Sequence, residues 1–381
     1  MSWSAERQAR ACLAAASGGG MRALADLVAE HGPVEVWQTL RETSRTSLAE
    51  RARSVDAEEV ERATSRLGLR FVVPGDDDWH TGLDALSTPD PGRLDPGLGG
   101  IPLGLWLRGP LSLDGALAVG LVGSRASSTY GERVASDLGA DLAAGGSGGE
   151  GSCVVVSGGA YGIDAAAHRG ALSVGSTMAV MAGGLDEYYP KGNERLLATV
   201  AERGLLVSEV APGGRPTKAG FLARNRIIAA LCAGVVVVEA AHRSGALNTA
   251  AWASRLRRQV MAVPGPVTST LSLGTNRLLQ SGEAALVSNA GDVRELLLPL
   301  DATREAAERP VQGSLLDELP EMLVQVRECL YPRRPTSMDE IAEATGLRPP
   351  ECLAALGELE ERGLVAAHPA GWVLAQPRRP T

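Results

Sequence analysis

The chain has 381 residues, of which 44% are hydrophobic and 22% are charged. This length suggests two or three domains, and the apolar share excludes wholesale disorder. No apolar run approaches the roughly 20 residues that a membrane-spanning helix needs, and the first residues lack a signal-peptide pattern. The five cysteines are scattered without CxxC spacing, which argues against a zinc site and a disulfide framework. We therefore expect a soluble cytoplasmic protein with free thiols and no membrane span.

The net charge of −8 argues against a generally basic coat for nucleic acid, but it hides a local reversal. Between Pro212 and Arg258 the chain carries eight cations and one anion, Glu239, which gives a net charge of +7. A segment of this kind is typical of a polyanion site. The eight cations are Arg215, Lys218, Arg224, Arg226, Arg243, Arg255, Arg257 and Arg258.

Residues 1–68 predict a small helical domain. Ser4 is placed to cap a first helix, Met21–Glu30 carries apolar residues at helical spacing, and another helix is expected to start near Asp56. Residues 69–112 are rich in Pro, Gly and Asp, and one short strand is expected around Leu103–Leu107. We interpret this second segment as a lead-in to the next domain.

Residues 113–298 alternate short apolar runs with amphipathic stretches. The apolar runs predict strands at Ala118–Val122, Cys153–Val156, Thr177–Met181, Leu205–Val207, Val235–Glu239, Val260–Val263 and Ala285–Val287. Stretches between them predict helices at Gly131–Ala144, Asp164–Leu172, Asn193–Glu202 and Leu247–Leu256. Apolar strands that alternate with helices are typical of an α/β fold, in which helices cover both faces of a parallel sheet.

Residues 299–317 have no periodicity and predict a linker, and residues 318–378 predict a winged-helix domain. Three helices are expected there, at about 321–330, after a capping box of Ser337 and Glu340, and at about 350–361, followed by a small hairpin. Residues 318–378 hold ten acids and six arginines, a net charge of −4. Because this charge opposes binding to duplex DNA, we expect the domain to contact protein or to pack structurally.

Three loops expected after strands are rich in small residues. Ligands of doubly wound sheets bind at the carboxyl ends of the strands, and each of these loops leads into a helix whose N-terminus favours anions. The loops therefore predict phosphate cradles. The alternative is that their glycines only permit tight turns from strand to helix. The candidate binding residues in these loops are Gly123, Ser124, Arg125, Ser157, Gly158, Ser244 and Gly245.

Phe221, one of two phenylalanines in the chain, lies among four cations within a dozen residues. Cations that neutralise phosphates, together with a ring that stacks a base, are what a site for single-stranded nucleic acid needs. Lys218, Phe221, Arg224, Asn225 and Arg226 are therefore candidate binding residues. In the alternative interpretation, Phe221 lies in the core while Arg224 and Arg226 begin a solvated helix.

Other polar features predict less chemistry. Residues 76–80 favour a solvated turn over a cation site, and Asp164 with His168 favours a helix cap beside a satisfied histidine over an acid–base pair. Glu239 is either catalytic or paired with an arginine. The sequence contains no nucleophile elbow, HExxH or Walker motif, and its first strand-to-helix turn lacks GxGxxG, which disfavours dinucleotide binding.

In its ordered motifs the chain resembles the DNA-processing protein A family (DprA, also called Smf). The matching motifs are GLVGSR at 120–125, VVSGGAYGIDAAAHRGAL at 155–172, GGLDEYYPKGN at 183–193, SEVAPGG at 208–214, FLARNRIIAAL at 221–231, VVVEAAHRSGALNTA at 236–250 and VMAVPG at 260–265. The resemblance implies a Rossmann-like doubly wound, mostly parallel sheet, flanked by an N-terminal helical (SAM-like) domain and a C-terminal winged helix.

The same resemblance implies a function. Members of the family bind single-stranded DNA as dimers, protect incoming DNA during natural transformation and help to load the RecA recombinase onto it, without a catalytic step or a cofactor. By motif position, Arg125 and Lys218 would hold phosphates and Phe221 would stack a base, while the loops at Ser157 and Ser244 would supply backbone N–H groups. Two positions depart from the family: Tyr161 replaces a common cation, and Leu222 replaces a common proline.

Two rival functions stay open. Related Rossmann-like folds cleave nucleoside monophosphates, so a nucleotide-processing (phosphoribohydrolase-like) enzyme is the first rival, although the PGGxGTxxE loop of such enzymes is replaced by Pro212-Gly213-Gly214-Arg215-Pro216 here. The second rival is a scaffold whose basic face binds an acidic protein.

Overall fold

A computed structural model describes residues 3–42, 45–87, 97–115, 117–145, 151–298, 319–332 and 334–375. The chain divides into two compact units, Met1–Ala306 and Ala307–Thr381. The predicted linker at 299–317 lies outside the described residues, as do residues 146–150 of the glycine-rich stretch Gly145–Gly151. The finer domain boundaries expected from the sequence stay predictions. No helix in the described ranges is long and apolar enough to cross a membrane.

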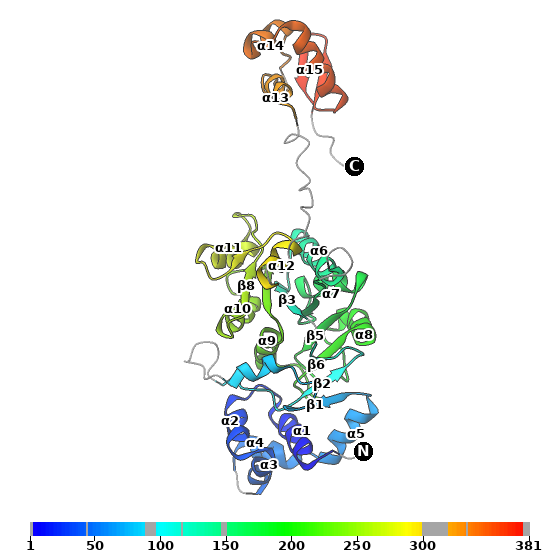
Figure 1. Cartoon of the computed structure of the whole chain (residues 1–381), viewed down its shortest axis with the longest axis vertical. Helices are drawn as coiled ribbons and strands as arrows, with labels where there is room; N and C mark the ends of the chain where they lie inside the picture. The colour runs from blue at the N-terminus through cyan, green and yellow to red at the C-terminus, as the bar shows by residue number, and fades with distance from the viewer. Residues whose placement is uncertain are drawn as a thin grey trace. The chain divides into compact units, whose positions relative to one another are not determined.

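The first unit is built on a nine-stranded sheet with the order β1-β2-β6-β5-β4-β3-β7-β8-β9 (Figure 1). Its parallel strands are β3 (Ala118–Gly123), β4 (Val154–Ser157), β5 (Thr177–Met181), β6 (Leu205–Ser208), β7 (Gly234–Glu239), β8 (Gln259–Ala262) and β9 (Ala285–Leu286). The predicted parallel α/β fold is confirmed. The lead-in segment contributes more than expected, because β1 (Arg70–Val72) and β2 (Leu105–Arg108) extend the sheet antiparallel beyond β6.

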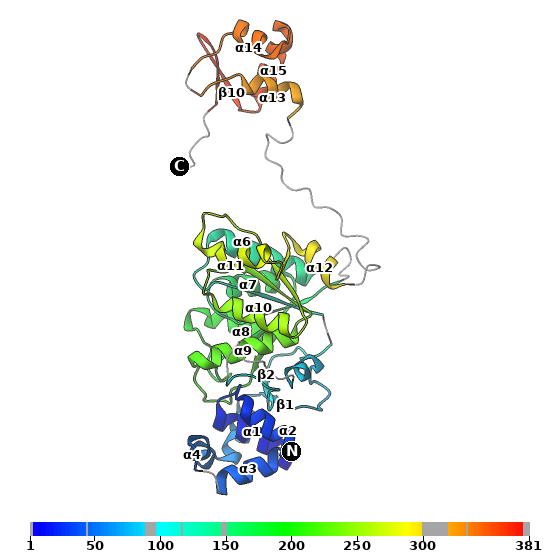
Figure 2. The ribbon, with the colours of Figure 1, turned by 90° about the vertical axis from the view of Figure 1, so that its left-hand side faces the viewer.

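Helices cover both faces of this sheet (Figures 1 and 2). One face packs against α6 (Thr129–Ala144), α7 (Ile163–Val174) and α8 (Glu194–Arg203), and the other against α9 (Lys218–Leu231) and α10 (Gly245–Arg255). The valines of β7 show why its sequence is apolar throughout. Val235 and Val237 belong to the core under α9 and α10, whereas Val236 and Val238 belong to the core under α6 and α7. Successive strand side chains point to opposite faces, so a strand covered on both sides needs no polar alternation.

Shorter helices complete the sheet domain. They are α11 (Leu273–Gln280), α12 (Ala290–Leu297) and the 3₁₀ turns η1 (Thr81–Ser87), η2 (Lys191–Asn193) and η3 (Thr270–Ser272).

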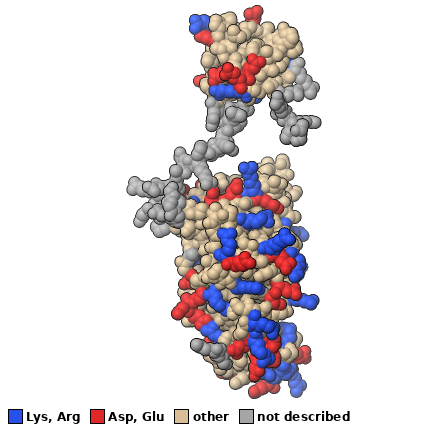
Figure 3. Space-filling model, turned by 90° about the vertical axis from the view of Figure 1, so that its right-hand side faces the viewer, with Lys and Arg blue, Asp and Glu red and all other residues tan. Residues whose placement is uncertain are grey.

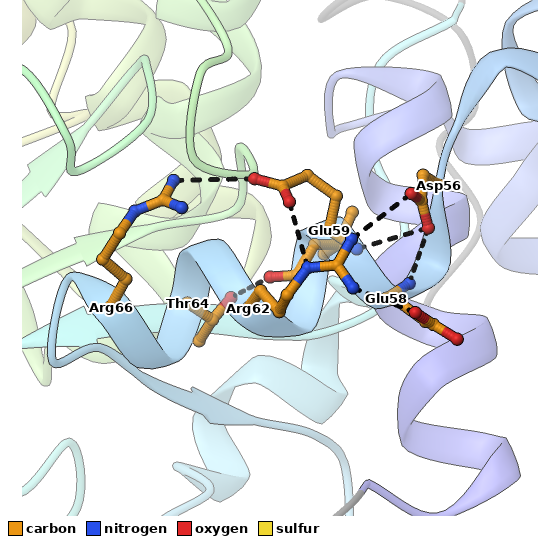
Figure 4. A network of polar contacts seen from close by, with 7 residues as sticks. Asp56, Glu58, Glu59, Arg62, Thr64 and Arg66 are labelled. Carbon is orange, nitrogen blue, oxygen red and sulfur yellow. Dashed lines mark hydrogen bonds and ion pairs between the residues drawn. The ribbon is translucent and has the colours of Figure 1, made fainter.

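The described residues of the N-terminal region form five helices. They are α1 (Ala5–Ser17), α2 (Arg22–His31), α3 (Pro33–Glu42), α4 (Ser47–Ser54) and α5 (Ala57–Arg66). Ser4 caps α1 as predicted, since its side chain accepts a hydrogen bond from the N–H of Arg7. Asp56 caps α5 by accepting from Glu58 and Glu59, and Arg62 bridges these three carboxylates on the exposed surface (Figure 4). Exposed pairs of this kind contribute little to stability. The sequence pattern missed α3 and α4.

A continuous core joins these helices to the sheet. The rings of Trp3, Phe71 and Trp106 follow one another with centroid separations of 5.3 and 4.4 Å. Trp106 of β2 is fully buried, and its indole N–H donates to Thr64 Oγ1 of α5 at 3.0 Å. The helical region therefore packs directly onto the sheet.

The second unit contains α13 (Glu321–Glu328), α14 (Met338–Thr345) and α15 (Pro349–Glu361), followed by the hairpin β10 (Val365–His368) and β11 (Gly371–Leu374). Ser337 and Glu340 form the predicted capping box at α14. Leu323, Ile341 and Leu356 belong to a core of its own. Three helices and a hairpin confirm the predicted winged helix.

Candidate nucleic-acid interface

The strand order changes direction at β3. The chain builds the sheet from β3 through β4 and β5 to β6 on one side, and then returns to place β7 on the other side of β3. The loops that follow β3 and β7 therefore separate at their carboxyl ends, which is where doubly wound sheets bind ligands. A pocket of about 470 Å³ lies at this point, and we call it the switch-point pocket. Its charged and aromatic lining residues are Arg125, Asp164, Lys218, Phe221, Arg224 and Arg243.

The wall of the pocket combines cations with an aromatic ring. Arg125, Lys218 and Arg243 are exposed, while Phe221 is partly buried. The guanidinium of Arg125 lies 4.5 Å from the centroid of the Phe221 ring, which is a cation–π contact. Phe221 thus lies at the surface of the pocket rather than in the aliphatic core, and it lies on the same pocket as both cations that the resemblance assigns to phosphates.

A smaller hollow adjoins this pocket and shares Arg125, Ala160 and Phe221 with it. Tyr161 and Tyr189 line its other side, and the Tyr189 ring lies 5.9 Å from that of Phe221. Tyr189 was not predicted from the sequence as a site residue. The signal was the Tyr-Tyr pair in a chain with 3% aromatic residues.

The floor of the pocket holds two buried groups that can carry opposite charge, Arg224 and Asp164. Arg224 is buried, its Nε has no hydrogen-bond partner among the described residues, and a Cβ at Gly158 would overlap its guanidinium. Burial raises the pKa of Asp164, and the charge of Arg224 opposes that shift. The carboxylate of Asp164 accepts the N–H groups of Gly158 and Ala160 at 3.2 and 3.4 Å.

The loop after β4 has fewer free donors than a phosphate cradle would need. Asp164 already occupies two of its N–H groups, and Gly158 is a glycine because Arg224 packs on it. The hydroxyl of Ser157 is fully buried and donates to the carbonyl of Leu121 at 2.6 Å. The Ser157 hydroxyl and the Gly158 N–H, which the sequence predicts as ligand contacts, thus have partners inside the protein in this structure.

In the loop after β3, the donors of Ser124 also have hydrogen-bond partners inside the protein. The N–H of Ser124 donates to the carbonyl of Glu239 at 2.7 Å, and its hydroxyl donates to the carbonyl of Ala126. A Cβ at Gly123 would clash with Ile163 of α7, so this glycine permits close packing between strand and helix. In this loop, Arg125 is the residue that offers its side chain to the pocket.

The loop after β7 stays open. Ser244 caps α10 by accepting from the N–H of Ala246, and Gly245 is exposed with no atom within 4 Å of a Cβ built there. Asn225 braces this helix start, since its Nδ2 donates to Gly245 O at 3.3 Å and to Asn248 Oδ1 at 3.2 Å. The N-terminus of α10 therefore faces the pocket as a potential anion site.

Arg226 does not belong to the interface, and its prediction as a binding residue is corrected here. Its side chain is fully buried, and two of its nitrogens donate to the carboxylate of Glu209 at 2.8 and 2.9 Å. The remaining contacts go to the carbonyls of Gly100 and Ala223. Every nitrogen of this guanidinium is satisfied inside the protein, so none can reach a phosphate.

The cationic segment at 212–258 is thus not one patch. Arg226 is buried, Arg255 lies over the ring of Trp252, and Arg257 follows α10 at the opposite end of the strands from the pocket. On the face of the first unit shown in Figure 3, basic and acidic side chains are interspersed. The positive charge at the pocket is local.

The remaining polar features have structural roles. Glu239 accepts from the N–H and hydroxyl of Ser128 at the start of α6, and it forms no ion pair with an arginine among the described residues. His168 is fully buried with Nδ1 2.9 Å from Thr177 Oγ1, and burial lowers its pKa to about 3. Asp76 pairs with Arg7 in the predicted turn. Across the described residues, no cluster of potential ligands could hold a metal ion.

Two family descriptions match the chain. Residues 91–298 match DNA recombination-mediator protein A, and residues 312–371 match the DprA winged helix domain. The chain belongs to the DNA recombination-mediator protein A family. The resemblance to DprA and Smf proteins is thereby confirmed, and the chain is a DNA-processing protein of this family.

Similar proteins cover most of the chain. The putative DNA processing protein DprA of Mycobacterium tuberculosis strain H37Rv is 44% identical over 358 residues, covering 92% of this chain and 89% of that protein. The solved structure of DprA from Streptococcus pneumoniae has a TM-score of 0.62 and 32% identity, covering 76% of this chain and 96% of that one. A structure of DprA from Helicobacter pylori, described for its single-stranded DNA binding mode, has a TM-score of 0.50 and 28% identity, covering 60% and 95%.

Proposed function

We propose that this chain binds single-stranded DNA at the switch-point pocket. The main support is that Arg125 and Lys218, two exposed cations, line one pocket whose wall carries the partly exposed ring of Phe221. Cations bind the phosphates of a strand, and an aromatic face stacks an unpaired base, so this combination favours a single strand over a duplex. The Helicobacter pylori relative adds support, because its structure is described in terms of single-stranded DNA binding.

In this proposal the residues have distinct roles. Arg125 and Lys218 hold phosphates, and Phe221 stacks a base. Because the Arg125 guanidinium covers one face of the Phe221 ring in the free protein, it must move before a base can stack on that face. Arg224 adds positive charge from the floor, and the open start of α10 at Ser244–Gly245 offers backbone N–H groups.

We further propose that the chain protects incoming DNA during natural transformation, helps to load the RecA recombinase, and acts in the cytoplasm as a homodimer. Family membership supports these roles. We also propose that the pocket carries out no catalytic step. Asp164, the carboxylate among the pocket's described lining residues, is buried and already accepts two backbone N–H groups, so it is poorly placed to act as a base.

A titration of labelled oligo-dT and of a duplex of equal length tests the binding function, with wild type and Phe221→Ala. We expect wild type to prefer the single strand, and Phe221→Ala to lose about 1–3 kcal/mol of binding free energy. Thermal unfolding of both proteins controls for a folding defect. Equal affinity for both DNAs, or wild-type binding by Phe221→Ala, would contradict the proposal. Release of a free base from AMP would instead support the nucleotide-processing enzyme.

A further inference from the structure

The first turn of α9 separates two hollows in the first unit. Lys218 and Phe221 line the switch-point pocket on one side. Thr217, Ala219 and Gly220 line a second hollow of about 560 Å³ on the other side. We call this second hollow the hairpin groove, because its far wall is the turn between α1 and α2. Its lining residues are Ala15, Ser17, Gly18, Gly19, Met21, Gly97, Leu98, Ala182, Val210–Arg215, Thr217, Ala219 and Gly220.

The chemistry of the hairpin groove suits a polyanion. Arg215 is the charged residue among its described lining residues, which include no carboxylate. Arg215 is exposed and forms no ion pair with any described residue. The positive end of α9 lies between the groove and the switch-point pocket, with Thr217 as its cap.

The two walls of the groove are held together by buried contacts, so the groove is a fixed feature of the fold. A Cβ at Gly20 of the α1–α2 turn would overlap the Cβ of Ala223, which shows that this turn packs directly on α9. The carboxylate of Glu209 lies beside Gly19 and forms the buried ion pair with Arg226 of α9.

We propose that the DNA strand held in the switch-point pocket continues across the first turn of α9 into the hairpin groove, where Arg215 binds a further phosphate. This inference rests on the proposed single-stranded DNA binding and extends it to a second segment of the same strand. The N-terminal helical region then forms part of the DNA path, and the path has a defined minimum length. A short oligonucleotide fills the pocket alone, whereas a longer one also reaches Arg215.

Arg215→Ala tests the new contact by its dependence on DNA length. Each phosphate neutralised on a single strand contributes a slope of about 0.7 in log affinity against log salt, which corresponds to about a 4-fold change in affinity at about 0.15 M salt. We expect this loss, and the matching decrease in slope, with oligo-dT of roughly 20 nucleotides and no loss with roughly 5 nucleotides. The control is Arg257→Gly, which removes an exposed cation at the end of the strands opposite to the pocket. Glycine suits this position because the φ of Arg257 is 55°.

Gly18 allows a second test of the groove wall. It has φ of 74°, and a Cβ there would meet no atom within 4 Å. Asn and Asp both tolerate this backbone conformation and have nearly the same shape. We expect Gly18→Asp to weaken binding of the long oligonucleotide by repelling phosphates, and Gly18→Asn to bind like wild type.

The outcomes separate this inference from the proposed function. Loss of long-strand affinity in Arg215→Ala and Gly18→Asp, with their controls unchanged, supports the groove. If these variants match their controls while Lys218→Ala weakens both oligonucleotides, the groove is not on the DNA path and the pocket function stands. If Arg215→Ala weakens both lengths equally, Arg215 belongs to the pocket and the inference is wrong. If Lys218→Ala weakens binding of neither oligonucleotide, the proposed function itself is wrong.

Discussion

Lys218→Ala gives the sharpest test of the electrostatic part of the proposal. Lys218 begins α9 at the pocket, is exposed, and has no ion pair with any described residue, so its charge is available to a phosphate. One phosphate contact on a single strand adds about 0.7 to the slope of log affinity against log salt. The ratio of wild-type to variant affinity should therefore be about 8-fold at about 50 mM salt and about 3-fold at about 200 mM.

Fluorescence anisotropy with labelled oligo-dT at several salt concentrations measures this ratio directly. Phe221→Ala provides the contrast, because loss of stacking lowers affinity by a similar factor at every salt concentration. A ratio for Lys218→Ala that does not change with salt would refute a phosphate contact. A salt-dependent loss of the same size in Arg257→Gly would show that the effect comes from overall charge and not from the pocket.

Three further predictions concern buried groups of the first unit. Arg226→Ala should lower the free energy of unfolding by about 3–5 kcal/mol in urea titrations, because it leaves the buried carboxylate of Glu209 unpaired; a variant as stable as wild type would contradict this. Gly158→Ala should cost about 1–3 kcal/mol of stability and weaken DNA binding, since its Cβ displaces the guanidinium of Arg224; unchanged binding would show that Arg224 does not matter to the pocket. The buried His168 has a pKa of about 3, below that of an unfolded histidine, so between these values the unfolded chain binds a proton that the folded chain does not. Stability should therefore rise by about 2 kcal/mol from pH 5 to pH 7, and His168→Gln should flatten that part of the profile.

The strands could be predicted because their signal is local. The buried run at Thr177–Met181 coincides with β5, and the valines of β7 mark a strand covered on both faces. The helix α9 was harder to predict. Its stretch mixes four polar or charged residues with apolar ones, and its two buried arginines, Arg224 and Arg226, break the usual link between charge and exposure.

The site was predicted in part for the same reason. Lys218 and Phe221 both lie on the pocket because they belong to the first turn of α9, which lines it. Arg226, eight positions after Lys218, instead pairs with Glu209. This partner lies on another segment, and no spacing rule in the sequence connects the two residues. Gly158 was predicted as a donor to phosphate, but its lack of a side chain serves Arg224 instead. Small residues in a loop do not reveal which neighbour needs the space.

The row of rings formed by Trp3, Phe71 and Trp106 has a consequence for dissecting this protein. Trimming the chain to begin at Leu69 would remove Trp3 and Thr64. The indole of Trp106, which is fully buried in the intact fold, would then expose an apolar surface to solvent. Such a shortened protein would tend to self-associate, and multimers seen with it would reflect the cut rather than the native assembly. Stoichiometry should therefore be measured on the chain that keeps residues 1–68.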